Sequence, residues 1–229
     1  MTRIEVIYVE LPELIESNLL HNSLSLLSSN ERDLYDRCLP KRKIEFLTGR
    51  VLLKKKLANY LECSPHEIIF MKNKYGKLFL ATDASVHFNL SHSENIVVAA
   101  FCITKDIGID VEYVWKNHLD IMPYVFVREE VDWVKQHENL NDQMQAFSYI
   151  WTRKEAVMKA LGKGFSHSPL SFKVPIEMGD SKDNTWYYTT FSILDKYLIS
   201  IVQTIQPEEK IDISKKCLSF ENLYELDVL

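Results

Sequence analysis

The chain has 229 residues, of which 46% are hydrophobic and 26% are charged, and its formal net charge is −5. These values are ordinary for a globular protein, and the length is enough to bury a substantial core in one large domain or in two closely packed halves. The negative charge gives no general attraction to nucleic acid, so we expect no nucleic-acid partner.

The cysteines and the hydropathy pattern indicate in which cellular compartment the protein is expected. No Cys-x-x-Cys pair occurs, and such spacing fits reduced thiols better than a disulfide framework or a zinc site. No run reaches the roughly 18 apolar residues of a membrane-spanning helix, and the first residues lack the pattern of a secretory signal. We therefore expect a cytoplasmic protein that is neither secreted nor embedded in a membrane.

The first half of the chain reads as a long helix and a small sheet. Residues 4–11 predict a strand, and Ser28-Ser29-Asn30-Glu31 predicts a helix N-cap. Between residues 43 and 61 apolar side chains recur with helical spacing, and Ser64-Pro65 indicates where that helix ends. The polar residues 74–77 predict a turn. Short strands are predicted at 67–71, 78–80, 86–90 and 96–101.

The second half repeats this composition of elements, although no repeat is visible in the letters. A strand is predicted at 107–112, and Gly162 is expected to end the second long helix. The turn Asp195-Lys196 predicts a hairpin. Helices are predicted at 128–136 and 143–161, and strands at 172–174, 186–193 and 197–202. The sequence thus predicts an α+β fold with two halves, residues 1–105 and 106–229.

Three acidic residues are the strongest chemical signal. Asp110 and Glu112 are two apart on a predicted strand, so their side chains share one face, and Glu155 lies in the second long helix. Each has an ordinary alternative, a solvated strand face for the pair and an exposed helix acid for Glu155. Together, three carboxylates suit Mg²⁺, which prefers a few protein oxygens and keeps room for substrate phosphates.

Polar and basic residues add an anion-binding signal. Ser91 and His92 stand at the end of a predicted strand, where they could bind a phosphate or form a locally satisfied turn. Glu155 and Lys159 are four apart and share a helix face, whereas Lys154 lies on another face. Basic residues near small-residue turns are consistent with a ligand that carries several phosphates. They gather at Lys41-Arg42-Lys43 with Arg50, at Lys77, and at Lys154 with Lys159.

Three blocks in this order resemble the 4′-phosphopantetheinyl transferases, specifically the double-length class that includes the activators of surfactin synthetase. The resemblance extends from about Lys41 to Val174. The blocks are Tyr75-Gly76-Lys77 with His87-Phe88-Asn89-Leu90-Ser91-His92-Ser93, then Gly108-Ile109-Asp110-Val111-Glu112, then Trp151-Thr152-Arg153-Lys154-Glu155-Ala156 through Lys159 to Leu161-Gly162-Lys163-Gly164.

The resemblance implies an enzyme that transfers the phosphopantetheine arm of coenzyme A to a serine of an apo carrier protein and releases adenosine 3′,5′-bisphosphate. It implies that Mg²⁺ is held by Asp110, Glu112 and Glu155, and that Glu155 takes the serine proton directly or through a water. Glu112 varies in other double-length members and is present here. The coenzyme contacts implied are Ser91 and His92 for the 3′-phosphate, Lys77 for the nucleotide, Lys159 and Asp110 at the pyrophosphate, and Lys41 for a phosphate.

The resemblance also implies two similar α+β halves related by a pseudo-twofold axis, with coenzyme A between them. The N-terminal half would supply nucleotide contacts, and the C-terminal half would supply the metal site and carrier docking. We expect a monomer that acts on acyl or peptidyl carriers of fatty-acid, polyketide or nonribosomal peptide synthesis. The apolar segment 115–127 could be a carrier-docking surface or buried core.

Two other functions remain open on the residues alone. One is a Mg²⁺-dependent hydrolase of coenzyme A or another nucleotide pyrophosphate, in which water replaces the carrier serine. The other is a coenzyme-A-binding or docking module without activity, and the presence of all three acids argues against it.

Overall fold

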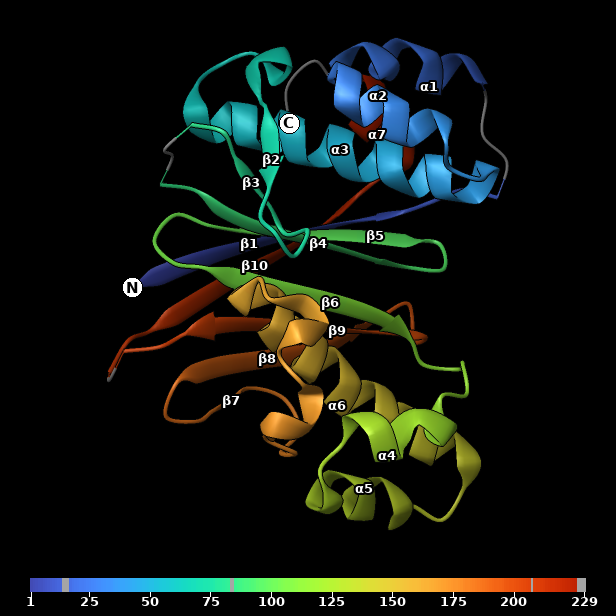
Figure 1. Ribbon diagram of the computed structural model, residues 1–229, viewed down its shortest axis with the longest axis vertical. Coiled ribbons are helices and arrows are strands. Elements are labelled where there is room, and N and C mark those ends of the chain that lie inside the picture. Colours follow the sequence, from blue (N-terminus) through green and yellow to red (C-terminus); the bar gives the residue numbers. More distant parts are fainter. Residues whose placement is uncertain (14–16, 83–84, 207, 226–229) are drawn as a thin grey trace.

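The computed structural model describes residues 1–13, 17–82, 85–206 and 208–225, and it has an α+β architecture built in layers (Figure 1). Helices cover the outer face of one four-stranded sheet, a second four-stranded sheet packs against its inner face, and further helices lie beyond the second sheet. The expected α+β class is therefore confirmed.

The first half follows the predicted order of elements. The predicted N-cap is confirmed, because the Ser28 side chain accepts a hydrogen bond from the Glu31 backbone N–H and the Glu31 carboxylate accepts one from that of Ser28. The elements are β1 (Thr2–Glu10), α1 (Ser17–Ser23), α2 (Ser29–Asp36), α3 (Pro40–Leu61), β2 (Phe70–Lys72), β3 (Leu78–Leu80), β4 (His87–Ser93) and β5 (Ile96–Cys102).

In the second half the predicted strands at 107–112, 186–193 and 197–202 and the helices at 128–136 and 143–161 are present. Gly162 ends the long helix in a left-handed conformation, as predicted, with φ of 63°. The strand predicted at 172–174 is wrong, because these residues form no regular element. The elements are β6 (Ile107–Tyr113), α4 (Met122–Val125), α5 (Arg128–Lys135), α6 (Leu140–Leu161), β7 (Ser181–Lys182), β8 (Trp186–Ile193), β9 (Tyr197–Thr204), β10 (Ile211–Leu218) and α7 (Phe220–Glu225).

The two halves share one connectivity. In the first, β1 leads into α3 and then into the hairpin of β4 and β5, and β5 pairs antiparallel with β1. In the second, β6 leads into α6 and then into the hairpin of β8 and β9, and β9 pairs antiparallel with β6. Both long helices have 22 residues. Two similar helix-plus-sheet halves are thus present, while a pseudo-twofold axis stays a prediction.

The end of the chain returns to the first half. Strand β10 pairs parallel with β1 at the edge of the first sheet. Phe220 and Leu223 of α7 are buried in the core beneath α3, and the Tyr224 hydroxyl lies 2.9 Å from Thr48 Oγ1. Residues 211–225, which belong to the predicted half 106–229, thus pack with the N-terminal sheet and its helices.

The core between the two sheets positions strand β6. Ile107, Ile109 and Val111 point into this core beside residues of β1, β5 and β9. Because strand side chains alternate, Gly108, Asp110 and Glu112 face the other way, towards α6. No helix among the described residues is long and apolar enough to cross a membrane.

Candidate active site

Strand β6 and helix α6 come close enough for their backbones to touch, and Gly108 makes this possible. A Cβ atom at Gly108 would lie 1.9 Å from the carbonyl oxygen of Ala156 and 2.6 Å from the Ala160 backbone nitrogen. Any side chain there would force the strand and the helix apart. The close approach brings the acids of β6 against the face of α6 that carries Glu155 and Lys159.

Asp110 is at the centre of this contact and is only 4% exposed. Its Oδ1 accepts hydrogen bonds from Lys159 Nζ at 2.6 Å and from Ser91 Oγ at 2.9 Å, and Lys159 also donates to Ser91 Oγ at 2.7 Å. The other carboxylate oxygen, Oδ2, is buried and has no hydrogen-bond partner among the described residues. An unpartnered buried carboxylate oxygen is costly, so this atom is suited to bind a cation or a proton.

Glu112 is held from both sides. Trp151 Nε1 donates to its Oε1 at 3.2 Å, and Ser93 Oγ lies 3.3 Å from its Oε2. Ser93 also accepts a hydrogen bond from the Tyr113 backbone N–H. The second strand acid is therefore oriented by one residue of α6 and one of β4.

Burial disfavours the charged forms of the three acids, and the charge of Asp110 adds to this effect at Glu112 and Glu155. Burial is the largest cause of the raised pKa of Asp110, which Lys159 opposes. Burial, then the charge of Asp110, raises the pKa of Glu112 to about 7 and that of Glu155 to about 7. Such shifts are characteristic of carboxyl groups in functional sites, where a bound cation would favour their ionised forms.

A cavity of about 400 Å³ is lined by residues from both halves; of the three acids, Glu155 lines it, whereas Asp110 and Glu112 are not among its lining residues. Glu155, Met158 and Lys159 of α6 form one wall, followed by Gly162, Gly164 and Phe165. The opposite wall comes from the N-terminal half. Its residues are Arg42, Glu45, Phe46 and Arg50 of α3, Lys72 of β2, Tyr75, Gly76 and Lys77 of the turn between β2 and β3, Leu78 of β3, and Phe88, Asn89, Leu90 and His92 of β4.

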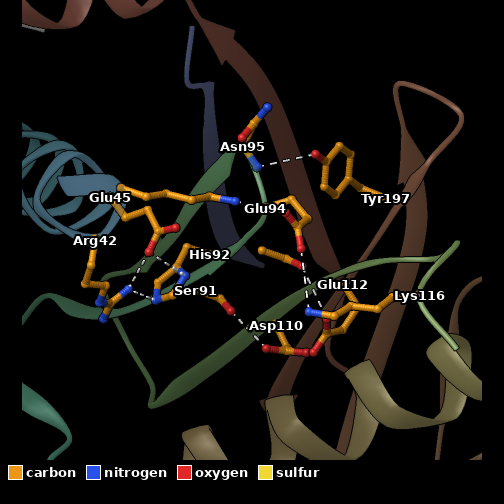
Figure 2. A network of polar contacts seen from close by, with 12 residues as sticks. Arg42, Glu45, Ser91, His92, Glu94, Asn95, Asp110, Glu112, Lys116 and Tyr197 are labelled. Atoms are coloured by element: carbon orange, nitrogen blue, oxygen red, sulfur yellow. Dashed lines mark hydrogen bonds and ion pairs between the residues drawn. The ribbon is translucent and has the colours of Figure 1, made fainter. Parts of the chain in front are cut away.

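A polar cluster occupies the N-terminal wall (Figure 2). Arg42 Nη1 contacts His92 Nε2, and it lies 2.9 Å from Glu45 Oε2, which is 3.5 Å from His92 Nδ1. Burial, assisted by the Arg42 charge, lowers the pKa of His92 to about 4, so this imidazole is neutral at pH 7. The wall therefore offers a guanidinium and a neutral imidazole to a ligand.

Of the other residues predicted to contact coenzyme A, Lys77 lines the cavity, whereas Ser91 and Lys41 do not. Ser91 is buried and faces Asp110 instead of lining the cavity. Lys77 lines the cavity, but its ammonium donates to the Ala160 carbonyl at 2.8 Å, and burial lowers its pKa. Lys41 is paired with Glu94 at 2.9 Å and is not among the lining residues, whereas its neighbour Arg42 is.

The structure also shows where Lys154 and the segment 115–127 lie. Lys154, expected among the cations of the site, is fully buried away from it in an ion pair with Glu130 at 2.9 Å. The segment 115–127 combines both alternatives, because Met122, Val125 and Phe126 are buried in the core whereas Trp115 and Tyr124 are exposed.

Arg42, Ser93 and Trp151 lie at the site although the sequence analysis assigned them no individual role, and Phe165 was not expected there. Helical spacing places both Lys41 and Arg42 near Glu45, so the sequence held no signal that favours Arg42 over Lys41. Ser93 is two residues beyond Ser91 on the same strand face, as Glu112 is beyond Asp110.

The three acids do not form a preassembled metal site. Among the described residues, no three His, Cys, Asp or Glu side chains are arranged to hold a metal ion. Their chemistry nevertheless fits a hard divalent cation, because Asp110 Oδ2 has no partner within the part of the chain that the structure describes and all three carboxyl groups have raised pKa values. Lys159 supplies the positive charge at Asp110 in this structure.

Comparison with known proteins agrees with this arrangement. Residues 16–104 match the family model described as 4′-phosphopantetheinyl transferase, N-terminal, and residues 106–206 match the 4′-phosphopantetheinyl transferase superfamily. The chain is 33% identical over 162 residues to 4′-phosphopantetheinyl transferase gsp of Aneurinibacillus migulanus, covering 70% of this chain and 67% of that protein. It is 28% identical over 204 residues to 4′-phosphopantetheinyl transferase Sfp of Bacillus subtilis, covering 85% and 89%. The chain therefore belongs to the 4′-phosphopantetheinyl transferase family, enzymes that transfer the phosphopantetheine arm of coenzyme A to carrier proteins.

Proposed function

We propose that the transfer takes place at the acids of β6 and α6, with coenzyme A in the cavity between the halves and with Mg²⁺ as cofactor. The observation that carries this proposal is a cavity with Glu155 and Lys159 on one wall and Arg42 and His92 on the other, where Lys159 also contacts the buried Asp110. Asp110, Glu112 and Glu155 would hold Mg²⁺, which, when bound, neutralises charge that develops on the pyrophosphate.

Glu155 would act as the general base. The carrier serine oxygen forms a bond to the phosphorus that bears the pantetheine arm, the bond from that phosphorus to the bridging pyrophosphate oxygen breaks, and adenosine 3′,5′-bisphosphate leaves. The serine proton passes to the Glu155 carboxylate, directly or through a water. Without a bound cation the pKa of Glu155 is raised to about 7, and the ionised form that Mg²⁺ would favour is the form that can accept the serine proton.

The cations have separate roles in this proposal. Lys159 reaches both the cavity and Asp110, so it can move its charge towards the pyrophosphate when a cation binds the acids. Arg42, rather than Lys41, would contact a phosphate together with His92, because only Arg42 lines the cavity. Ser91 would orient Asp110 and Lys159 instead of contacting the coenzyme.

We further propose that the chain works as a monomer in the cytoplasm. One copy already contributes both walls of the cavity, so catalysis needs no residue from a second copy. Exposed Tyr124, Phe165 and Trp115 would meet the carrier, and the physiological carrier is to be identified by ranking a panel of apo carriers.

The test is a transfer assay with coenzyme A, Mg²⁺ and an apo carrier, followed by mass spectrometry of the carrier. We expect the carrier to gain one phosphopantetheine arm, and Glu155→Ala to abolish this gain while the variant keeps its circular dichroism spectrum. Release of adenosine bisphosphate without a carrier would instead indicate a hydrolase. A Glu155→Ala variant that transfers at the normal rate would refute the role given to Glu155.

A further inference from the structure

The turn between β2 and β3 is built around Asn73. Its Oδ1 accepts hydrogen bonds from the backbone N–H groups of Tyr75 at 2.9 Å and Lys77 at 3.0 Å. The backbone closes the same turn, because Asn73 N donates to Lys77 O and Gly76 N donates to Asn73 O, each at 3.0 Å. One side-chain oxygen thus fixes the shape of the turn.

The same side chain reaches across to the other half of the molecule. Asn73 Nδ2 donates to the Gly162 carbonyl at 2.7 Å, and Lys77 Nζ donates to the Ala160 carbonyl at 2.8 Å. The last carbonyls of a helix have no partner within it, so these two donors complete the C-terminus of α6. The approach is close, since a Cβ atom at Gly162 would lie 2.7 Å from Lys77 Cδ and 3.2 Å from Asn73 Nδ2.

This contact joins the two walls of the cavity. Tyr75, Gly76 and Lys77 of the turn line one side, while Gly162 and Phe165 line the other. We call the hydrogen bond from Asn73 Nδ2 to Gly162 O the Asn73 bridge. Asn73 itself is not a lining residue, so it can influence a ligand only through the walls that it holds together.

We infer that Asn73 is a positioning residue that preorganises the cavity for coenzyme A by fixing the β2–β3 turn of the N-terminal half to the end of α6. The inference rests on the proposed function, because it takes coenzyme A to occupy this cavity. Without the bridge the turn must be ordered when the ligand binds, and this ordering reduces affinity. The acids lie on β6 and on earlier turns of α6, so the chemical step is left intact.

The sharpest variant is Asn73→Asp, which keeps an oxygen to accept from the turn but places a second oxygen against the Gly162 carbonyl. We expect the Kd for coenzyme A, measured by calorimetry, and the KM for coenzyme A to rise about five- to tenfold, with kcat changed less than twofold. The control is Lys74→Gln in the same turn, which changes the net charge by the same −1 as Asn73→Asp. We expect it to leave the Kd for coenzyme A within twofold of the value for the unsubstituted chain. Equal Kd values for the two variants would overturn the inference.

Two further variants separate the bridge from general destabilisation. Asn139→Ala removes the N-cap at the opposite end of α6, where Asn139 Oδ1 accepts from the Asp142 N–H at 2.9 Å, and is expected to lower Tm without raising KM. Asn73→Ala removes the bridge together with the two turn hydrogen bonds of Oδ1, adds no charge, and provides the measurement if Asn73→Asp does not fold. A normal KM for Asn73→Ala would refute the bridge.

Measurements on the unsubstituted chain separate a failure of the proposed function from a failure of the Asn73 bridge. Coenzyme A binding without transfer to any carrier would refute the proposed function and leave the bridge standing if Asn73→Asp weakens that binding. Transfer by the unsubstituted chain together with an unaffected Asn73→Asp variant would refute the bridge alone. No coenzyme A binding by the unsubstituted chain would overturn both.

Discussion

Two lysines of helix α6 each contact a buried carboxylate, and their surroundings differ. Lys154 and its partner Glu130 are 0% and 1% exposed, and their charged groups are 2.9 Å apart. Lys154 also donates to the carbonyls of Pro169 and Phe172, while Glu130 accepts from the Val174 and Val127 backbone N–H groups. Each charged group is thus surrounded by partners, and no ligand has a place there.

The pair of Lys159 and Asp110 is closer at 2.6 Å, yet it is incomplete. The Lys159 side chain is 28% exposed and lines the cavity, and Asp110 Oδ2 has no hydrogen-bond partner among the residues described. Two further acids with raised pKa values stand beside this pair. A satisfied buried ion pair holds a fold together, whereas an unsatisfied one beside a cavity is suited to bind a ligand.

The largest expected effect is on the rate of transfer and concerns the incomplete pair. Glu155→Gln keeps the shape of the side chain but cannot accept the serine proton, so kcat should fall about 10²- to 10⁴-fold. Thermal unfolding at neutral pH should be unchanged or shifted upwards, because a desolvated carboxylate has been removed. A normal kcat for Glu155→Gln would contradict the assignment of the Lys159–Asp110 region to catalysis. A large loss of stability without a loss of rate would contradict it as well.

The complementary variant acts on the satisfied pair. Lys154→Met leaves Glu130 buried without its cation, and we expect a loss of about 3–5 kcal/mol in the free energy of unfolding, measured with urea. The fraction that remains folded should keep its kcat. The matched variant Lys159→Met should instead lower kcat about 10²-fold with a smaller loss of stability. Reversed outcomes for the two lysines would contradict the comparison.

Stability should depend on pH through Glu112 and Glu155. Because burial raises the pKa of both to about 7 from an ordinary 4.5, they stabilise the fold fully below about pH 4.5, and this contribution is lost as the pH rises through about 7. Mg²⁺ would favour the ionised forms, so it should raise Tm more at about pH 8 than at about pH 5.5. Scanning calorimetry with and without EDTA measures this difference, and Glu155→Gln should reduce it. A Mg²⁺ effect independent of pH would contradict the assigned ligands.

The smallest expected effect concerns the orientation of Glu112. Trp151→Phe keeps an aromatic ring against Phe147 and Phe165 but removes the N–H that donates to Glu112. We expect a loss of about fivefold in kcat, which corresponds to one hydrogen bond of about 1 kcal/mol, and a higher Mg²⁺ concentration for half-maximal rate. The tyrosine-to-phenylalanine change at Tyr149, on the other side of α6, is the control and should leave the Mg²⁺ requirement unchanged.

Local patterns predicted the elements well where local interactions determine them. The strands at 78–80 and 186–193 have the predicted bounds, and the Ser28 capping box and the Gly162 C-cap are where side-chain chemistry indicated them. Strand β10 was missed because it is an exposed edge strand whose second half, with Lys215 and Lys216, carries no alternating apolar pattern. Its pairing with β1 depends on a distant partner and leaves no local signal.

The sequence alone determined the residue types of the site and the strand face of two acids, because alternation along a strand is a local property of the backbone. It also determined the family, through three motifs in a recognisable order. Only the tertiary structure decided that Arg42, and not its neighbour Lys41, lines the cavity. It also decided that Lys154 forms a buried ion pair within the fold, whereas Lys159 lies in the site. The reason is physical, since burial, the completeness of hydrogen bonding and the close approach of strand β6 to helix α6 depend on contacts between residues far apart in the chain.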